Sequence, residues 1–161
     1  MTNLRGLLIW CFLFLAGGAF AQTNIRLGTI SADPTAPVEV TAETLVIDQE
    51  TGAAVFSGNV QIVQGDLSIV AGEVEVVYVE ETGQISSLSI RGGVEFTGPS
   101  ESAKAETAEY DISGGMLVLR GNVVLTQGLS AISAGEMTVN LVTGSAVLTG
   151  RVRTTLQQSG N

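Results

Sequence analysis

Carboxylates are the commonest side chains in this chain that could carry out chemistry. Sixteen Asp and Glu residues stand against seven Lys and Arg, and two acids at a suitable separation can act as general acid and base, as in glycoside hydrolysis. Four of the acids, however, occupy equivalent places in a repeated pattern: Glu43, Glu73, Glu106 and Glu136. A residue that recurs in every repeat suits a surface or corner role better than a unique site. We therefore expect no catalytic residues and no enzyme activity.

Other reactive or ligand-binding groups are scarce. The sequence has no His, and its one cysteine, Cys11, lies in an N-terminal apolar run, so composition argues against a Ser or Cys triad, disulfides and imidazole-bound metals. Asp48, Asp66 and Asp111 lack the spacing of a calcium loop. Neither a G-x-S-x-G elbow nor a phosphate-binding glycine loop is present, because the glycines fall at the corners of the repeat. We expect no metal and no cofactor.

Residues 1–21 have the features of a cleavable signal peptide. Arg5 precedes an apolar run over residues 7–16, and Ala19-Phe20-Ala21 forms a small-residue cleavage pattern. The run is shorter than the roughly 20 residues that span a bilayer. We expect export and cleavage after Ala21, with a retained N-terminal anchor as the alternative. Loss of Arg5 makes the net charge of −9 more negative by one unit, and such a surface repels nucleic acid and anionic membranes.

The rest of the chain alternates apolar and polar residues between glycine turns. Period two dominates, as in Val74, Val76 and Tyr78, and no helical stripe is evident. Two markers recur in register at intervals of about 30 residues. The first is a turn dipeptide at 51–52, 82–83, 114–115 and 143–144, and the second is a corner that begins with Gly and ends with Val, at 58–60, 92–94, 121–123 and 150–152.

These four strand-turn-strand repeats predict an all-β fold. Each unit has one apolar face that it cannot bury alone, so successive units must stack. We expect an antiparallel β-jellyroll, a partly open sandwich or flattened barrel of about a dozen short strands, with a parallel β-helix as the rival. The domain is expected at residues 37–157, after a flexible lead-in at 22–36 and before a tail at 158–161. The aliphatic interior suits either a packed core or a lining that receives acyl chains.

Three segments give the chain a family resemblance: Pro37–Glu43, Val55–Gly65 and Leu117–Gln127, of which the last two share the phrase F/L-x-G-N-V-x-(I/L)-x-Q. Residues 36–157 thereby resemble the OstA-like domain family of lipopolysaccharide-transport proteins. The resemblance implies a β-jellyroll in the periplasm of a Gram-negative cell, with an apolar groove that shields the acyl chains of lipid A. It also implies end-to-end homo-oligomers that join the inner-membrane anchored and the outer-membrane barrel components of the lipopolysaccharide transport system.

The resemblance also assigns residues to the lipid-binding groove. Motif position assigns Val38, Val40, Phe56, Phe96, Tyr110 and Ile112, and strand parity adds Ile62, Ile69, Val76, Leu119 and Val139. For each of them the competing interpretation is plain core packing. The chain departs from the family in a compact segment between Tyr78 and Val94 and in a short tail after Leu156. Another class of function stays open, that of a secreted structural or adhesive β-repeat protein with a packed interior and no lipid ligand.

Overall fold

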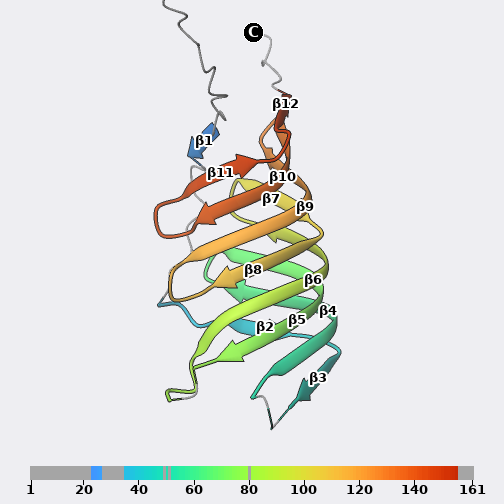
Figure 1. Cartoon of the computed structure of the whole chain (residues 1–161), viewed down its shortest axis with the longest axis vertical. Helices are drawn as coiled ribbons and strands as arrows, with labels where there is room; N and C mark the ends of the chain where they lie inside the picture. Colours follow the sequence, from blue (N-terminus) through green and yellow to red (C-terminus); the bar gives the residue numbers. More distant parts are fainter. Residues whose placement is uncertain (1–22, 27–34, 49, 51, 80, 156–161) are drawn as a thin grey trace, which may run out of the picture.

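The computed structural model, which describes residues 23–26, 35–48, 50, 52–79 and 81–155, contains β-strands and no helix within those residues. Twelve strands form one continuous sheet in which every pairing is antiparallel (Figure 1). Their bounds are β1 (Thr23–Arg26), β2 (Glu39–Thr41), β3 (Thr44–Ile47), β4 (Ala54–Gln64), β5 (Leu67–Tyr78), β6 (Ile85–Thr97), β7 (Glu101–Ala105), β8 (Thr107–Asp111), β9 (Met116–Gln127), β10 (Ser130–Asn140), β11 (Ser145–Thr149) and β12 (Arg153–Thr155). The predicted all-β antiparallel fold is confirmed, and the parallel β-helix is excluded.

The five longest strands, β4, β5, β6, β9 and β10, bend near their middle. Strands β4, β6 and β9 bend at the predicted corners, whereas β5 and β10 bend beside Gly72 and Gly135, where no corner was predicted. In β5, Leu67, Ile69 and Ala71 are buried before the corner, and after Gly72 the buried set changes parity. The pairing register of β4, β5 and β10 shifts at the same places. A bulge of this kind turns the strand and lets both halves face one interior.

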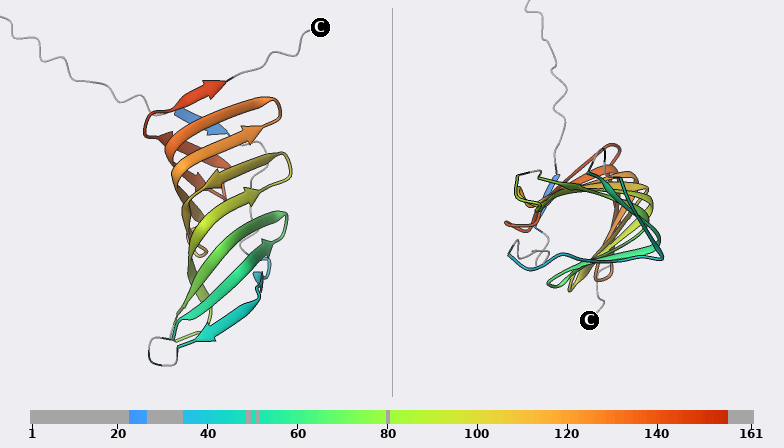
Figure 2. Two further views of the ribbon diagram at one scale, coloured as in Figure 1. Left: turned by 90° about the vertical axis from the view of Figure 1, so that its right-hand side faces the viewer. Right: turned by 90° about the horizontal axis from the view of Figure 1, so that it is seen from below.

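The bends divide the sheet into two walls. The first wall consists of β1, β3, β8 and β11 with residues 54–57, 73–78, 85–91, 116–120 and 136–140 of the long strands. The second wall consists of β2, β7 and β12 with residues 60–64, 67–71, 94–97, 123–127 and 130–134. Seen end-on, the walls meet along the line of corners and stand apart on the opposite side, which we call the mouth (Figure 2).

The corners have the same backbone conformation in all four units. Each contains two consecutive residues with positive φ, at 58–59, 92–93, 121–122 and 150–151, and glycine adopts this region without steric cost. Neighbouring strands also approach closely there, because a Cβ on Gly92 would lie 3.1 Å from the Cα of Gly72. The recurring Gly and Asn residues are therefore required by the geometry of the bend.

The recurring acids lie at or beside these corners, as predicted. Glu43 and Glu106 accept hydrogen bonds from the side-chain amides of the corner residues Asn59 and Asn122, at 2.5 and 2.6 Å. Glu136 instead accepts a 2.9 Å bond from the guanidinium of Arg120. These carboxylates stabilise the bends and are not gathered in one place.

The hydrophobic core fills the space between the walls with aliphatic side chains from both. One residue of the predicted alternation does not belong to it: Tyr78 is 37 % exposed. Tyr78 is the last residue of β5, beside a register shift and the exposed turn that follows. The compact segment that follows closes in a turn where Val79 N–H donates to the carbonyl of Gln84 at 2.8 Å, and β6 then pairs with β5 in register.

The two ends of the stack differ. One ends in β2 and β3, and the other in β11, β12 and β1. Strand β1 comes from the segment 22–36, which we expected only to lead into the domain, yet it pairs with β11 at the far end. The signal peptide, its cleavage site after Ala21, residues 27–34 of the lead-in and the tail lie outside the described residues. Within the described part, no helix is long and apolar enough to cross a membrane.

Candidate functional site

The fold brings all eleven predicted groove residues to the interior. Seven of them are at most 1 % exposed: Ile62, Ile69, Val76, Phe96, Tyr110, Leu119 and Val139. The other four, Val38, Val40, Phe56 and Ile112, are partly buried and pack against the same core. For the five residues chosen on strand parity, Ile62, Ile69, Val76, Leu119 and Val139, burial agrees with that parity. Contact with an acyl chain is a separate property, and for all eleven it stays a prediction.

The interior is closed in this conformation. Phe96 and Ile69, which are paired neighbours on β6 and β5 of the second wall, are both 0 % exposed, so no open trough runs between the walls at their level. The aliphatic side chains of the two walls fill the space against one another. An apolar ligand can therefore reach these side chains only if the walls move apart.

A polar bridge crosses this apolar interior at the mouth. The hydroxyl of Tyr110, on β8 of the first wall, donates a 2.6 Å hydrogen bond to Oε1 of Gln64 at the end of β4 in the second wall. Nε2 of Gln64 donates in turn to the carbonyl of Ala36 at 3.2 Å. Burial raises the pKa of Tyr110 to about 12, and the charge of Asp111 adds to the rise. The hydroxyl is therefore protonated at neutral pH and acts as a donor.

Gln64 was missing from the predicted lining because it is polar. Two signals pointed to it: it closes the phrase that carries the family resemblance, and it shares the parity of Val60 and Ile62, both of which are buried. The equivalent glutamine of the second phrase, Gln127, is exposed and donates to Glu101 within the second wall at 3.2 Å. The two copies of the phrase thus have the same fold and different side-chain contacts.

Comparison with known proteins identifies a family that this chain matches. Residues 39–155 match the model of the LptA/(LptD N-terminal domain) LPS transport protein family. The chain belongs to this family. An uncharacterized protein of Rhizobium meliloti (strain 1021) is 27 % identical over 143 residues, which cover 83 % of this chain and 77 % of that protein. As a member of the LPS transport family, the chain is a transport component.

A solved structure supports the fold. The chain is similar to the crystal structure of LptH of Pseudomonas aeruginosa, described as the LptA homologous periplasmic component of the conserved lipopolysaccharide transport device. The TM-score is 0.69 at 17 % sequence identity, and the match covers 79 % of this chain and 99 % of LptH. The predicted jellyroll architecture is thereby confirmed as that of the LPS transport family.

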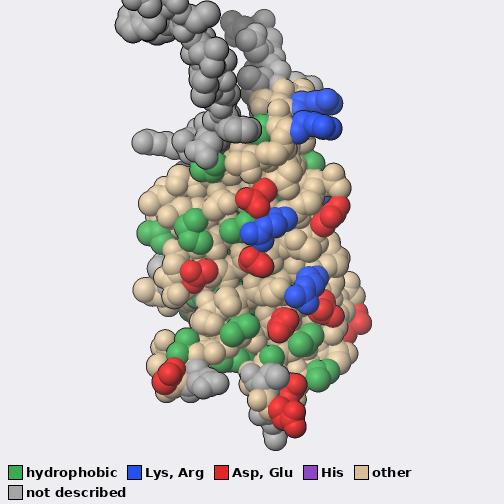
Figure 3. All heavy atoms as spheres, in the orientation of Figure 1, with side chains coloured by type: hydrophobic (Ala, Val, Ile, Leu, Met, Phe, Trp, Pro, Cys, Tyr) green, Lys and Arg blue, Asp and Glu red, His purple; other side chains and the backbone are tan. Residues whose placement is uncertain are grey.

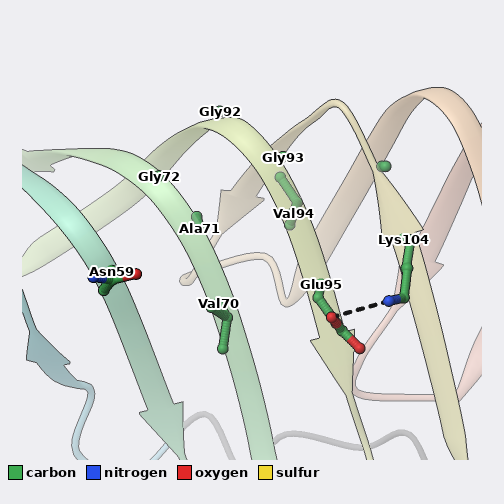
Figure 4. A pocket seen from close by; sticks show the side chains of 10 residues that line it. Asn59, Val70, Ala71, Gly72, Gly92, Gly93, Val94, Glu95 and Lys104 are labelled. Carbon is green, nitrogen blue, oxygen red and sulfur yellow. Dashed lines mark ion pairs between the residues drawn. The ribbon is translucent and has the colours of Figure 1, made fainter.

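Two hollows on the outer surface of this LPS transport family member are separate from the interior. One, of about 430 Å³, lies at the corners of units one and two, with the backbone of Gly72, Gly92 and Gly93 among its lining and the Glu95–Lys104 ion pair, 3.2 Å between charged atoms, at one side (Figure 4). The other, of about 520 Å³, lies at the corners of the last two units. Both result from the absence of side chains at the glycine corners.

Charged side chains on the outer surface of the described residues form local ion pairs. Acidic and basic side chains are intermixed on the face drawn in Figure 3. Arg120 bonds Glu109 at 3.0 Å and Glu136 at 2.9 Å, and these two carboxylates raise the pKa of its guanidinium. The N–H of Gly114 and the hydroxyl of Ser113 lower the pKa of the Asp111 carboxyl by hydrogen bonding. Among the described residues, no group of His, Cys, Asp or Glu is placed to hold a metal.

Proposed function

We propose that this protein binds lipopolysaccharide in the periplasm, holds the acyl chains of lipid A between its two walls, and bridges the inner-membrane anchored and outer-membrane barrel components of the transport system. Membership of the LPS transport family carries the proposal. The continuous aliphatic interior, faced by eleven predicted lining residues, supports the part that concerns the acyl chains. The signal-peptide pattern with cleavage after Ala21 supports the location.

The free energy of hydrating acyl chains favours a carrier with an apolar interior. Keeping one methylene group out of water is worth about 0.8 kcal/mol, so a lipid with several acyl chains does not cross an aqueous compartment unshielded at any useful rate. An interior that contains Phe96, Leu119 and Val139 offers the chains an apolar environment. The sugar part remains at the mouth, where the turns between strands are exposed to water.

Bridging uses the two ends of the stack. Strands β2 and β3 at one end, and β12 and β1 at the other, each pair on one side only among the described strands. An unpaired strand edge is a template for a strand of another chain. Successive copies, and the partners on either side, are therefore expected to add on end to end and to continue the apolar interior from one protein to the next.

Cross-linking in cells tests the lipid part of the proposal. A photoreactive benzoyl-phenylalanine at Phe96, which is fully buried, should capture lipopolysaccharide. The matched control is the same residue at Glu109, on the outer face of β8, where the side chain is 65 % exposed. Capture from Glu109 and not from Phe96 would refute an interior binding site. For bridging, sedimentation should show linear oligomers that grow with concentration, and a strict monomer with no affinity for its partners would contradict it.

The closed interior favours one other function, a secreted structural or adhesive β-repeat protein with a packed core and no lipid. The observation behind it is the complete burial of Ile69 and Phe96 among the other side chains of the interior. Native mass spectrometry of the protein purified from a lipopolysaccharide-producing host separates the two. A bound mass equal to that of lipopolysaccharide or lipid A supports transport, whereas consistently unliganded protein supports the structural function.

A further inference from the structure

The polar bridge at the mouth joins three segments that are distant in the sequence. Gln64 is the last residue of β4, beside the exposed turn at Gly65 and Asp66, and Tyr110 is the penultimate residue of β8. Both strands run from a corner toward the mouth, one in each wall. The 2.6 Å hydrogen bond between the two side chains therefore ties the free ends of the walls together.

The segment before β2 is tied to the same point. Gln64 accepts from Tyr110 through Oε1 and donates to the carbonyl of Ala36 through Nε2, so both ends of its amide are used. Val38, two residues further on, packs against the core. Residues 36–38 are thus tied to the first unit by the hydrogen bond from Gln64 to Ala36 and by the packing of Val38.

Burial makes this bridge strong relative to a surface hydrogen bond. Gln64 and Tyr110 are each 1 % exposed, so water cannot readily replace either partner, and a buried donor or acceptor left alone costs more than an ordinary hydrogen bond contributes. The other side-chain hydrogen bonds described above stay within one wall or at a corner. In the second copy of the phrase, Gln127 bonds Glu101 in its own wall and ties nothing across the mouth.

We infer that the hydrogen bond between Tyr110 and Gln64 is a latch that keeps the two walls together and must break before an acyl chain enters the first half of the interior. The inference rests on the proposed function. Its reason is geometric: acyl chains need the space now filled by side chains of both walls, the walls can separate only at the mouth, and separation there pulls the end of β4 away from β8. The latch thus determines how readily the empty protein admits lipid.

The first experiment removes the latch and follows uptake of a dansyl-labelled fatty acid and of purified lipopolysaccharide by the full mature chain. Tyr110→Phe keeps the ring and loses only the hydroxyl. Tyr78→Phe is the matched control, because Tyr78 is exposed on β5 and makes no cross-wall bond. Because Tyr110→Phe leaves a buried amide oxygen without its partner, the uptake rate should rise by roughly fivefold to a hundredfold in this variant and stay unchanged in Tyr78→Phe.

A second control is needed because Tyr110→Phe also lowers the stability of the whole fold. This control is a variant that is destabilised at a position away from the Tyr110–Gln64 bond. Val123→Ala removes two methyl groups from the core of the second wall, on β9, at a residue that is not among the predicted groove residues, and leaves the latch intact. When compared at the same fraction folded, Tyr110→Phe should take up the probe faster than Val123→Ala. Equal acceleration in both variants would show that stability alone controls uptake and would overturn the latch.

The converse experiment locks the mouth. Asp66→Cys and Ser113→Cys place thiols in exposed turns at the ends of the two walls, and the only native cysteine, Cys11, lies in the predicted signal peptide. Joining them with a reducible bis-thiosulfonate linker should slow uptake at least about tenfold, and reduction should restore it. Uptake unaffected by the linker overturns the latch while leaving the proposed function standing, whereas a wild-type protein that takes up neither probe nor lipopolysaccharide overturns both.

Discussion

Alkaline pH is expected to destabilise the protein through Tyr110. Burial raises the pKa of this phenol in the folded protein to about 12, from an ordinary value near 10. Because the unfolded chain loses the proton first, it binds fewer protons than the folded protein above pH 10, and the free energy of unfolding falls as the pH rises. The stability that depends on Tyr110 is complete below pH 10 and is lost as the pH passes through about 12.

The size of the effect follows from the shift. One pKa unit is worth about 1.36 kcal/mol, so the loss due to Tyr110 is about 1.4 kcal/mol near pH 11 and about 2 kcal/mol near pH 12. Urea unfolding between pH 8 and pH 12 measures it. All other groups titrate alike in Tyr110→Phe, so the difference in unfolding free energy between wild type and this variant isolates the phenol.

The free energy of unfolding of Tyr110→Phe should be lower than that of the wild type at pH 8 and should approach the wild-type value as the pH rises. At pH 8, Tyr110→Phe lacks the bond to Gln64 and leaves a buried amide oxygen without its partner, which costs about 1–3 kcal/mol. That gap should shrink by about 1.4 kcal/mol by pH 11. A gap that stays constant across this range would mean that Tyr110 titrates at its ordinary pKa, and would refute the argument that it is closed off from water.

Three further outcomes are expected. Phe96→Ala should cost about 3–5 kcal/mol of unfolding free energy in urea titrations, because the ring is fully buried; a loss below 1 kcal/mol would contradict that burial. Gly92→Ala should destabilise more than Gly93→Ala, since both have φ above +80° but only at Gly92 would a Cβ meet a neighbouring backbone; equal losses would show that the close approach is unimportant. Deleting residues 22–26 removes β1 and exposes the edge of β11, so analytical ultracentrifugation should show more self-association, and less would contradict β1 as a cover of that edge.

Much of the fold followed from the sequence because its signals are local. Alternation within a strand identified the inward residues of β4, such as Ile62, and those of β9, such as Leu119. Glycine and asparagine at positions 58–59 and 121–122 marked the corners because few other residues adopt positive φ there. Both signals depend on a few neighbouring residues, and the repeats present each of them several times.

The features that escaped prediction depend on contacts distant in the sequence or on breaks in the pattern. Tyr78 continues the parity of Val76 in sequence, but β5 ends at this residue beside a register shift, and the side chain is exposed. Gln64 is polar, and its side chain is therefore expected to be exposed. Its burial is favourable only because Tyr110, from the other wall, donates a hydrogen bond to it. The pairing of β1 with β11 joins the two ends of the chain, and no local pattern encodes it.

The position of β1 bears on how copies can join. Pairing with β11 satisfies one edge of the first wall, but a strand added to a sheet presents a new edge of its own. The second wall at the same end stops at β12, which pairs only with β10 among the described strands. A partner that extends both walls must therefore add to β1 or displace it in the first wall, while it can add to β12 directly in the second. Association that begins at β12 and then replaces β1 would be slower in the full mature chain than after deletion of residues 22–26, and association rates of the two proteins distinguish this order from simple addition to β1.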